Sequence, residues 1–141
     1  MLTAGSLEAL ADYFGKQPHV DAAFLFGSQA RGHVRAGSDV DIGVLMMRAA
    51  PREPLRAVRF TNDLMDLLGR SDVDVAILND ASPLLVHRVA QEGRVLYATS
   101  NTAVAEFALR ALQQYEDTKP LRELQAKQAS AIFATANKGP E

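Results

Sequence analysis

The chain has 141 residues, of which 48% are hydrophobic, and its 15 Lys and Arg residues nearly balance its 17 Asp and Glu residues. This length is sufficient for one compact domain and excludes a separate substrate domain. The balanced charge excludes a broad basic surface that binds long nucleic acids, and the absence of cysteine excludes disulfides and thiolate metal sites.

An amphipathic helix is predicted at the start of the chain. Ser6 is a suitable N-cap and Gly15 a suitable end, and the apolar residues between them have helical spacing: Leu7, Leu10, Ala11 and Phe14. We expect this helix to support the core.

A short apolar run, 22–26, leads into Gly27 and Ser28. Its length and aromatic content predict a buried strand. Gly27 allows the backbone to approach a ligand without a Cβ atom between them, and the N–H groups that follow can bind an anion. The guanidinium of Arg31 can neutralise triphosphate charge. We therefore predict a nucleotide-binding turn at Gly27, Ser28 and Arg31.

Ten residues separate Ser28 from a second predicted strand, 39–46. Apolar and other residues alternate along it, so Asp39 and Asp41 project from the same face. Two carboxylates ~7 Å apart along a strand suit hard divalent cations, which prefer oxygen ligands. The pair is a candidate metal site.

A third strand, 72–78, is predicted after a helix that begins at Pro54 and ends at Gly69. Such a crossover helix allows the strand to return beside the others. Asp72 and Asp74 share one face, and either can complete a carboxylate triad. Asp74 lies deeper in the apolar run, where a metal ion is its most natural partner. Three carboxylates can hold two Mg²⁺ ions that bridge a triphosphate.

Another helix is predicted from Ser82 and Pro83 to Gly93, followed by a short strand, 94–97. His87 on this helix is expected to face the surface. A longer helix from Thr102 follows.

Residues 1–100 are predicted to form a catalytic domain, and residues 101–141 a helical extension that packs on it. Pro120 is expected to interrupt the extension. Beyond it, a thin apolar stripe over 121–132 fits either a partner-binding arm or a solvated helix.

The combination of strand, Gly27-Ser28, ten residues, Asp39-x-Asp41 and second strand resembles the signature of the DNA polymerase β-like nucleotidyltransferase superfamily. Val73-Asp74-Val75 resembles the strand of the family's third carboxylate, and Ser82-Pro83 and 92–97 resemble its closing segment. The chain looks like a minimal nucleotidyltransferase, the MNT or MntA type of antitoxin. This resemblance implies an α/β (α+β) fold: a small mixed sheet with helices packed on one face and a C-terminal helical arm.

The resemblance also implies a function. Proteins of this type use ATP and Mg²⁺ to transfer AMP to a tyrosine of a HEPN ribonuclease toxin, which inactivates the toxin. The partners would then be a nucleoside triphosphate and a HEPN-domain toxin bound in a hetero-oligomer. Asp39, Asp41 and Asp74 would be catalytic and metal-binding. Two alternatives remain: transfer to a small acceptor such as an aminoglycoside, and neutralisation by binding alone.

No apolar run approaches the ~20 residues that span a bilayer, and the N-terminus lacks a basic segment followed by a long apolar core. We therefore expect a cytoplasmic protein without membrane contact.

Overall fold

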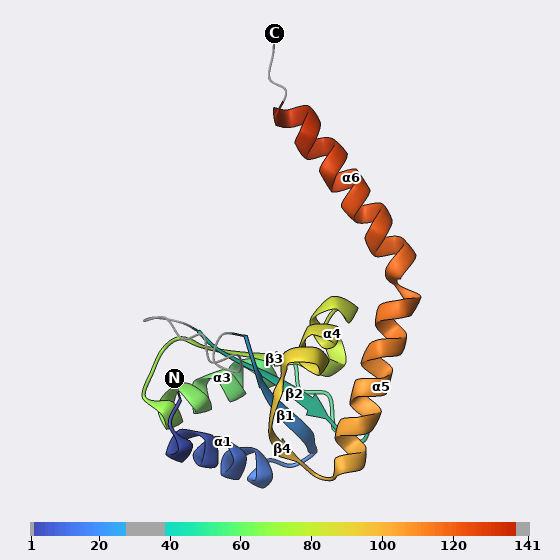
Figure 1. The fold of residues 1–141 in the computed structure, drawn as a ribbon. Coiled ribbons are helices and arrows are strands. Elements are labelled where there is room, and N and C mark those ends of the chain that lie inside the picture. Colours follow the sequence, from blue (N-terminus) through green and yellow to red (C-terminus); the bar gives the residue numbers. More distant parts are fainter. Residues whose placement is uncertain (1, 28–38, 138–141) are drawn as a thin grey trace.

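The computed structural model of the chain describes residues 2–27 and 39–137. Figure 1 shows a sheet with helices around it and a long helix that leads away to the C-terminus. The helices and strands follow in the order α1 (Ala4–Lys16), β1 (Val20–Phe26), β2 (Val40–Met46), α3 (Arg56–Leu68), β3 (Val73–Ile77), a 3-10 turn η1 (Leu78–Asp80), α4 (Pro83–Glu92), β4 (Arg94–Ala98), α5 (Asn101–Asp117) and α6 (Lys119–Asn137).

The four strands form one mixed sheet in the order β3-β2-β1-β4. β1 is antiparallel to both β2 and β4, whereas β2 and β3 run parallel. The parallel pair requires a crossover connection, which α3 supplies. The predicted mixed sheet is confirmed, and its topology brings the end of β1 beside the starts of β2 and β3.

Helices cover both faces of this sheet, so the prediction that they pack on one face is wrong. Strand β1 explains the difference, because its side chains on both faces are apolar and buried. A sheet that is apolar on both faces needs a cover on each. On one face, α1 and α3 pack over the sheet through a core cluster that includes Leu10, Phe14, Phe60, Leu64, Val20, Leu25, Val40 and Ile42.

The second face is covered by α4 and α5. Its core cluster includes Phe24, Phe26, Leu45, Leu78, Val86, Val89, Phe107 and Ala111. Phe24 and Phe107 stack with ring centroids 5.0 Å apart, which ties α5 to the sheet. The first helix of the extension is thus part of the core, whereas α6 projects away from the sheet in Figure 1.

Several predicted helix boundaries differ from those observed. Helix α1 continues through Gly15 to Lys16, and α3 begins at Arg56 and not at Pro54. Thr3, rather than Ser6, caps α1, since its side chain accepts a hydrogen bond from the Ser6 backbone N–H at 3.0 Å. The break between α5 and α6 falls at Thr118, because Pro120 occupies the first turn of α6, where its missing N–H costs nothing.

Other helix ends agree with the sequence. Gly69 ends α3 in the left-handed conformation, with φ 64°. Ser82 caps α4, with Pro83 in its first turn. Among the described residues, no helix is long and apolar enough to cross a membrane.

Candidate active site

Three sheet strands meet at one end of the molecule, and their ends carry the predicted acidic residues. Phe26, the last residue of β1, pairs with Asp41 near the start of β2. Asp41 in turn pairs with Asp74 across the parallel β2–β3 ladder. Directly opposed residues on neighbouring strands have side chains on the same face and close together. The sheet therefore brings Asp41 and Asp74 side by side.

This carboxylate pair lies on the face that α4 and α5 cover. Val40 and Ile42 belong to the cluster under α1 and α3, so alternation turns Asp41 to the opposite face. Leu45, on the same alternation as Asp41, packs in the cluster under α4 and α5. The site is thus open at the end of the sheet and bounded on one side by α4.

Gly27 follows Phe26 and adopts φ 75°, a conformation that L side chains rarely adopt. The Asp41 carboxylate occupies the space that a Cβ atom at Gly27 would need. The backbone turn after β1 therefore lies against the acidic pair, which is the close approach that the sequence predicts for a glycine here.

The surroundings of the Asp41 carboxyl disfavour its charged form. Its partial burial raises its pKa above the usual range, and the negative charges of Asp74 and Asp39 raise it further. The positive charge of Arg88 opposes this effect. A site that holds several carboxylates without a cation disfavours their ionisation, and a bound cation reverses that preference.

Asp72 and Asp74 have different partners. The Asp72 carboxylate accepts two hydrogen bonds from Arg70, from Nε at 2.5 Å and from Nη2 at 2.6 Å. The Arg70 side chain accordingly lowers the pKa of Asp72. Asp74 is exposed and lies in register with Asp41. Asp72 is therefore engaged in a local ion pair, and Asp74 is the carboxylate beside the candidate site.

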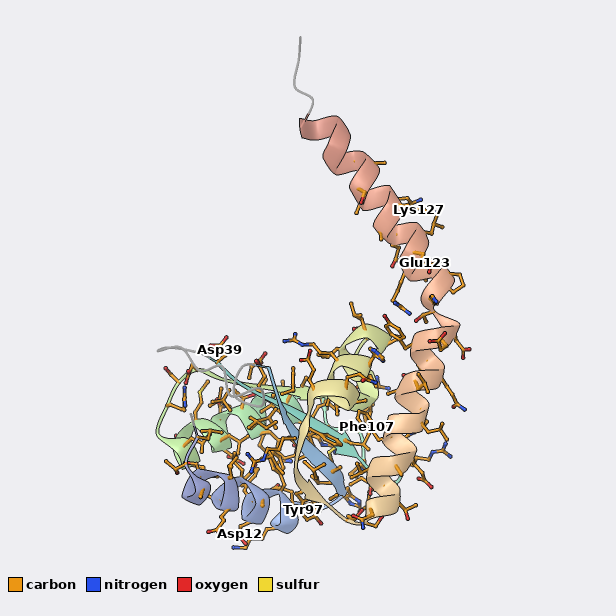
Figure 2. All side chains as sticks on the ribbon, in the orientation of Figure 1. Asp12, Asp39, Tyr97, Phe107, Glu123 and Lys127 are labelled. Atoms are coloured by element: carbon orange, nitrogen blue, oxygen red, sulfur yellow. The ribbon has the colours of Figure 1, made fainter. Side chains whose placement is uncertain are left out.

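Asp39 lies just before β2, where its side chain is exposed. Its charge contributes to the raised pKa of Asp41 and, after the larger effect of Asp72, to that of Arg70, so it lies near both the site and the Arg70–Asp72 pair. Figure 2 shows Asp39 at this end of the sheet. Within residues 2–27 and 39–137, no three acidic or histidine side chains converge tightly enough to enclose one ion.

The residues present nevertheless suit Mg²⁺ in their chemistry. Carboxylate oxygens are the ligands that this ion prefers, and it keeps several water ligands instead of demanding a complete protein cage. Asp41 and Asp74 are adjacent, and Asp39 is close enough to affect the ionisation of Asp41. These three residues would hold the metal, with waters and nucleotide phosphates as the remaining ligands.

Ser28 and Arg31, the other two residues of the predicted nucleotide-binding turn, lie outside the described residues. Of the predicted nucleotide-binding residues, the structure therefore places Gly27.

Sequence reasoning did not identify Arg88 on α4. Its guanidinium carbon lies 5.9 Å from the centroid of the Phe26 ring, so the side chain reaches the edge of the site. The only signal in the sequence is helical spacing. Val86 and Val89 face the core. Because successive residues of a helix are rotated by about 100°, residues 87 and 88 lie on opposite flanks of it.

His87 is on the other flank and is not the surface residue that was predicted. Its ring is half-buried and stacks on Tyr115 of α5 with centroids 3.7 Å apart. The Arg122 guanidinium carbon lies 3.5 Å from the Tyr115 ring centroid. This stack joins α4, α5 and the start of α6.

A groove of about 820 Å³ lies at the opposite end of the sheet, beside the ends of β2 and β3. Met46, Ile77 and Asn79 line it together with residues of the 47–57 segment. The predicted site residues that the structure describes, Gly27, Asp39, Asp41 and Asp74, do not line it. The candidate active site is therefore at the open end of the sheet and not in this groove.

The chain matches known proteins along most of its length. Residues 8–102 match the family model described as "Polymerase beta, Nucleotidyltransferase". The protein adenylyltransferase MntA of Aphanizomenon flos-aquae is 30% identical over 113 residues, which cover 75% of each protein. The protein adenylyltransferase MntA of Shewanella oneidensis is 29% identical over 106 residues, covering 75% of this chain and 73% of that protein.

Solved structures show the same fold. A crystal structure of a toxin–antitoxin with AMP-PNP has a TM-score of 0.69 and 25% identity, over 96% of this chain and 99% of that chain. A complex of tri-AMPylated Shewanella oneidensis HEPN toxin with MNT antitoxin has a TM-score of 0.62 and 23% identity, over 92% and 98% of the two chains. The matched family, the identity to two adenylyltransferases and the shared fold agree: the chain belongs to the polymerase β nucleotidyltransferase family and, within it, to the MntA protein adenylyltransferases.

Proposed function

We propose that this protein is the antitoxin of a toxin–antitoxin pair and that it transfers AMP from ATP to a tyrosine of a HEPN-domain ribonuclease toxin. The observation that carries the proposal is the in-register pair of Asp41 and Asp74 beside the Gly27 turn, in a chain of the MntA adenylyltransferase family. Simple binding of a partner does not require carboxylates at metal spacing.

Asp39, Asp41 and Asp74 are the proposed catalytic and metal-binding residues. They would hold two Mg²⁺ ions, which neutralise the triphosphate and lower the pKa of the attacking hydroxyl group. The raised pKa of Asp41 supports this role, because a site whose carboxylates repel each other gains from a cation. Gly27, Ser28 and Arg31 are the proposed nucleotide-binding residues.

The proposed reaction exchanges one phosphorus–oxygen bond for another. The tyrosine hydroxyl oxygen forms a bond to the α-phosphorus of ATP, and the bond from that phosphorus to the bridging oxygen of the β-phosphate breaks. The hydroxyl proton leaves to solvent, and the products are AMP-tyrosine and pyrophosphate. No protein nucleophile is needed, so the chain's residues act by positioning and by charge.

The proposed partner-binding surface includes α6. This helix presents Leu121, Leu124 and Ile132, which are 55%, 53% and 71% exposed. Residues 101–141 would then have two roles: α5 completes the core of the nucleotidyltransferase domain at 1–100, and α6 contacts the toxin. A hetero-oligomer with the toxin in the cytoplasm would bring the acceptor tyrosine to the nucleotidyltransferase domain.

The function can be tested with a purified cognate HEPN-domain toxin. We expect the ribonuclease activity of the toxin to fall after incubation with the wild-type protein, ATP and Mg²⁺, and to persist when either ATP or Mg²⁺ is omitted. The double variant Asp39→Asn, Asp41→Asn should fail to inactivate the toxin but should still bind it. Replacing carboxylates by amides preserves size and removes the charge that holds a metal.

Two outcomes would favour the alternatives. Inactivation of the toxin by the double variant without ATP would mean neutralisation by binding alone. Failure of the wild-type protein to modify the toxin, with AMP transfer to an aminoglycoside, would mean a small-molecule acceptor.

A further inference from the structure

We infer that Arg88 of α4 binds the β- and γ-phosphates of the nucleotide at the candidate active site. This residue lies outside the Gly27-Ser28 and Asp39/Asp41 segments on which the family assignment of the sequence depends. The inference rests on the proposed function and adds a specific phosphate-binding residue to it.

The position of Arg88 is fixed through Phe26. The Arg88 guanidinium carbon lies 5.9 Å from the centre of the Phe26 ring, which is 7% exposed and forms part of the core under α4. Phe26 is the residue directly before Gly27, and it pairs with Asp41 across the sheet. A triphosphate bound at the turn after Phe26 would therefore lie between the guanidinium and the carboxylates.

Arg88 lies on the same side of the sheet as the acidic pair. Phe26, beside the Arg88 guanidinium, pairs with Asp41, and directly opposed residues project from the same face. Phe26 and Leu45, which shares the alternation of Asp41, both belong to the core cluster under α4 and α5. The cation is therefore on the face to which Asp41 and Asp74 project.

The local ion pair of Arg88 leaves most of its hydrogen-bonding capacity available. Its Nε donates to Glu92 Oε2 at 3.4 Å, one helical turn away, and the Arg88 side chain is 46% exposed. A contact of this length on an exposed helix surface contributes little. A guanidinium has five donors in a planar fork that matches phosphate oxygens, so it can bind phosphate without leaving Glu92.

The negative charge of the site favours a nearby cation that can bind the outer phosphates. Asp39, Asp41 and Asp74 are all negative when ionised, and Arg70 at the same end is committed to Asp72 through two hydrogen bonds. For AMP transfer the α-phosphate would lie at the carboxylates, and we place the β- and γ-phosphates beside Gly27, the described residue of the turn, which lies against Asp41. A cation beside that turn stabilises them and the pyrophosphate that leaves.

Arg94 provides a matched control at the same end of the sheet. It pairs with Leu25 across the β1–β4 ladder, and Leu25 belongs to the core under α1 and α3. Because opposed residues share a face, Arg94 lies on the face opposite to the carboxylates, and it is exposed. Its replacement removes the same charge from the same end of the molecule without touching the proposed phosphate site.

The experiment compares the binding of AMP-PNP and AMP, each with Mg²⁺, by calorimetry. We expect Arg88→Ala to weaken AMP-PNP binding about tenfold and to leave AMP binding within about twofold of wild type, since the lost contacts are charged hydrogen bonds to the outer phosphates. Arg88→Lys should recover part of the loss, and Arg94→Ala should bind both ligands like wild type. Glu92→Gln should not weaken AMP-PNP binding, which separates phosphate contact from a mere loss of the ion pair.

Thermal melts of all variants show whether the fold is preserved. Unchanged AMP-PNP affinity in Arg88→Ala, or an equal loss for AMP and AMP-PNP, would overturn the role of Arg88. If the wild-type protein still transfers AMP in that case, the proposed function stands without this inference. A wild-type protein that binds no AMP-PNP in the presence of Mg²⁺ would overturn both.

Discussion

A Cβ atom at Gly27 would lie 2.6 Å from Oδ2 of Asp41. The turn after β1 therefore packs closely against the first carboxylate of β2. Any side chain at this position would force the Asp41 carboxylate, a proposed metal ligand, to move.

Replacing Gly27 by alanine should therefore damage both stability and activity. The positive φ alone costs about 1–2 kcal/mol for an L residue, and the contact with Asp41 adds to that cost. Gly69→Ala is the matched control, because Gly69 has φ 64° but no atom within 4 Å of its Cβ position. Urea unfolding and AMP transfer should show a larger stability loss for Gly27→Ala and an activity loss for that variant alone. Equal effects in both variants would contradict the contact with Asp41.

Asp41→Asn should stabilise the metal-free protein at neutral pH. The pKa of Asp41 is raised in the folded state, so ionisation of this group opposes folding as pH rises through the folded-state value. Removing a carboxylate directly opposite another should gain about 0.2–1 kcal/mol. In a chelating buffer, the stability difference between variant and wild type should grow from about pH 4 towards neutral pH. A variant that is less stable than wild type at neutral pH would be inconsistent with like-charge repulsion in the folded protein.

Asp74 and Asp72 should differ in their roles despite lying two residues apart. Asp74→Asn should reduce AMP transfer by about a hundredfold or more, as expected for a group that stabilises charge at the reacting phosphate. Asp72→Asn should retain most activity and lose some stability, because the ion pair with Arg70 is removed.

The pH dependence of the Asp72 effect has the opposite sign. The pKa of Asp72 is lowered in the folded state, so its contribution is present above its unfolded-state value and is lost as pH falls. Turnover numbers and urea midpoints at several pH values distinguish the two residues. If Asp72→Asn were inactive and Asp74→Asn active, Asp72 and not Asp74 would be the catalytic carboxylate.

Removal of α6 should leave the domain folded. Its apolar side chains are exposed, and its described contact with the core is through Arg122, which stacks on Tyr115 and donates to the Tyr115 carbonyl oxygen at 2.5 Å. A chain ending at Thr118 should keep its melting temperature within a few degrees and bind AMP-PNP like wild type. Its binding to the toxin should weaken, as size-exclusion chromatography and calorimetry can show. Undiminished toxin binding would place the partner surface elsewhere.

Much of the fold follows from local signals in the sequence. The strand runs, the Ser82-Pro83 start of α4 and the left-handed Gly69 end of α3 are short-range features, and they appear where they were expected. The alternation placed Asp72 and Asp74 on one face of their strand but left open which of them completes the triad, and the register of β2 with β3 shows that Asp74 lies beside Asp41. The sequence could not show that Arg70 engages Asp72, because a side chain's choice of partner depends on tertiary placement.

The two-sided cover of the sheet could have been derived from β1. Its residues are buried on both alternations, with a register shift between Val20 and Ala22 that moves Val20 and Ala23 to the same face. This register shift interrupts the alternation of side chains between the two faces, so the sequence of β1 does not show a simple period of two. Arg88 was not identified, and His87 was wrongly predicted to face the surface, for a different reason. Helical spacing places both on flanks of α4, and only the packing of this helix shows that one flank meets the site and the other meets Tyr115.

The most direct test of the account is the intact mass of the toxin after incubation with this protein, ATP and Mg²⁺. We predict that the toxin gains one or more AMP units on tyrosine with the wild-type protein, and none with the Asp39→Asn, Asp41→Asn variant, even though the variant still binds it. A toxin that is silenced equally well by both proteins without any mass increase would contradict the account, because neutralisation would then need neither the carboxylates nor the nucleotide.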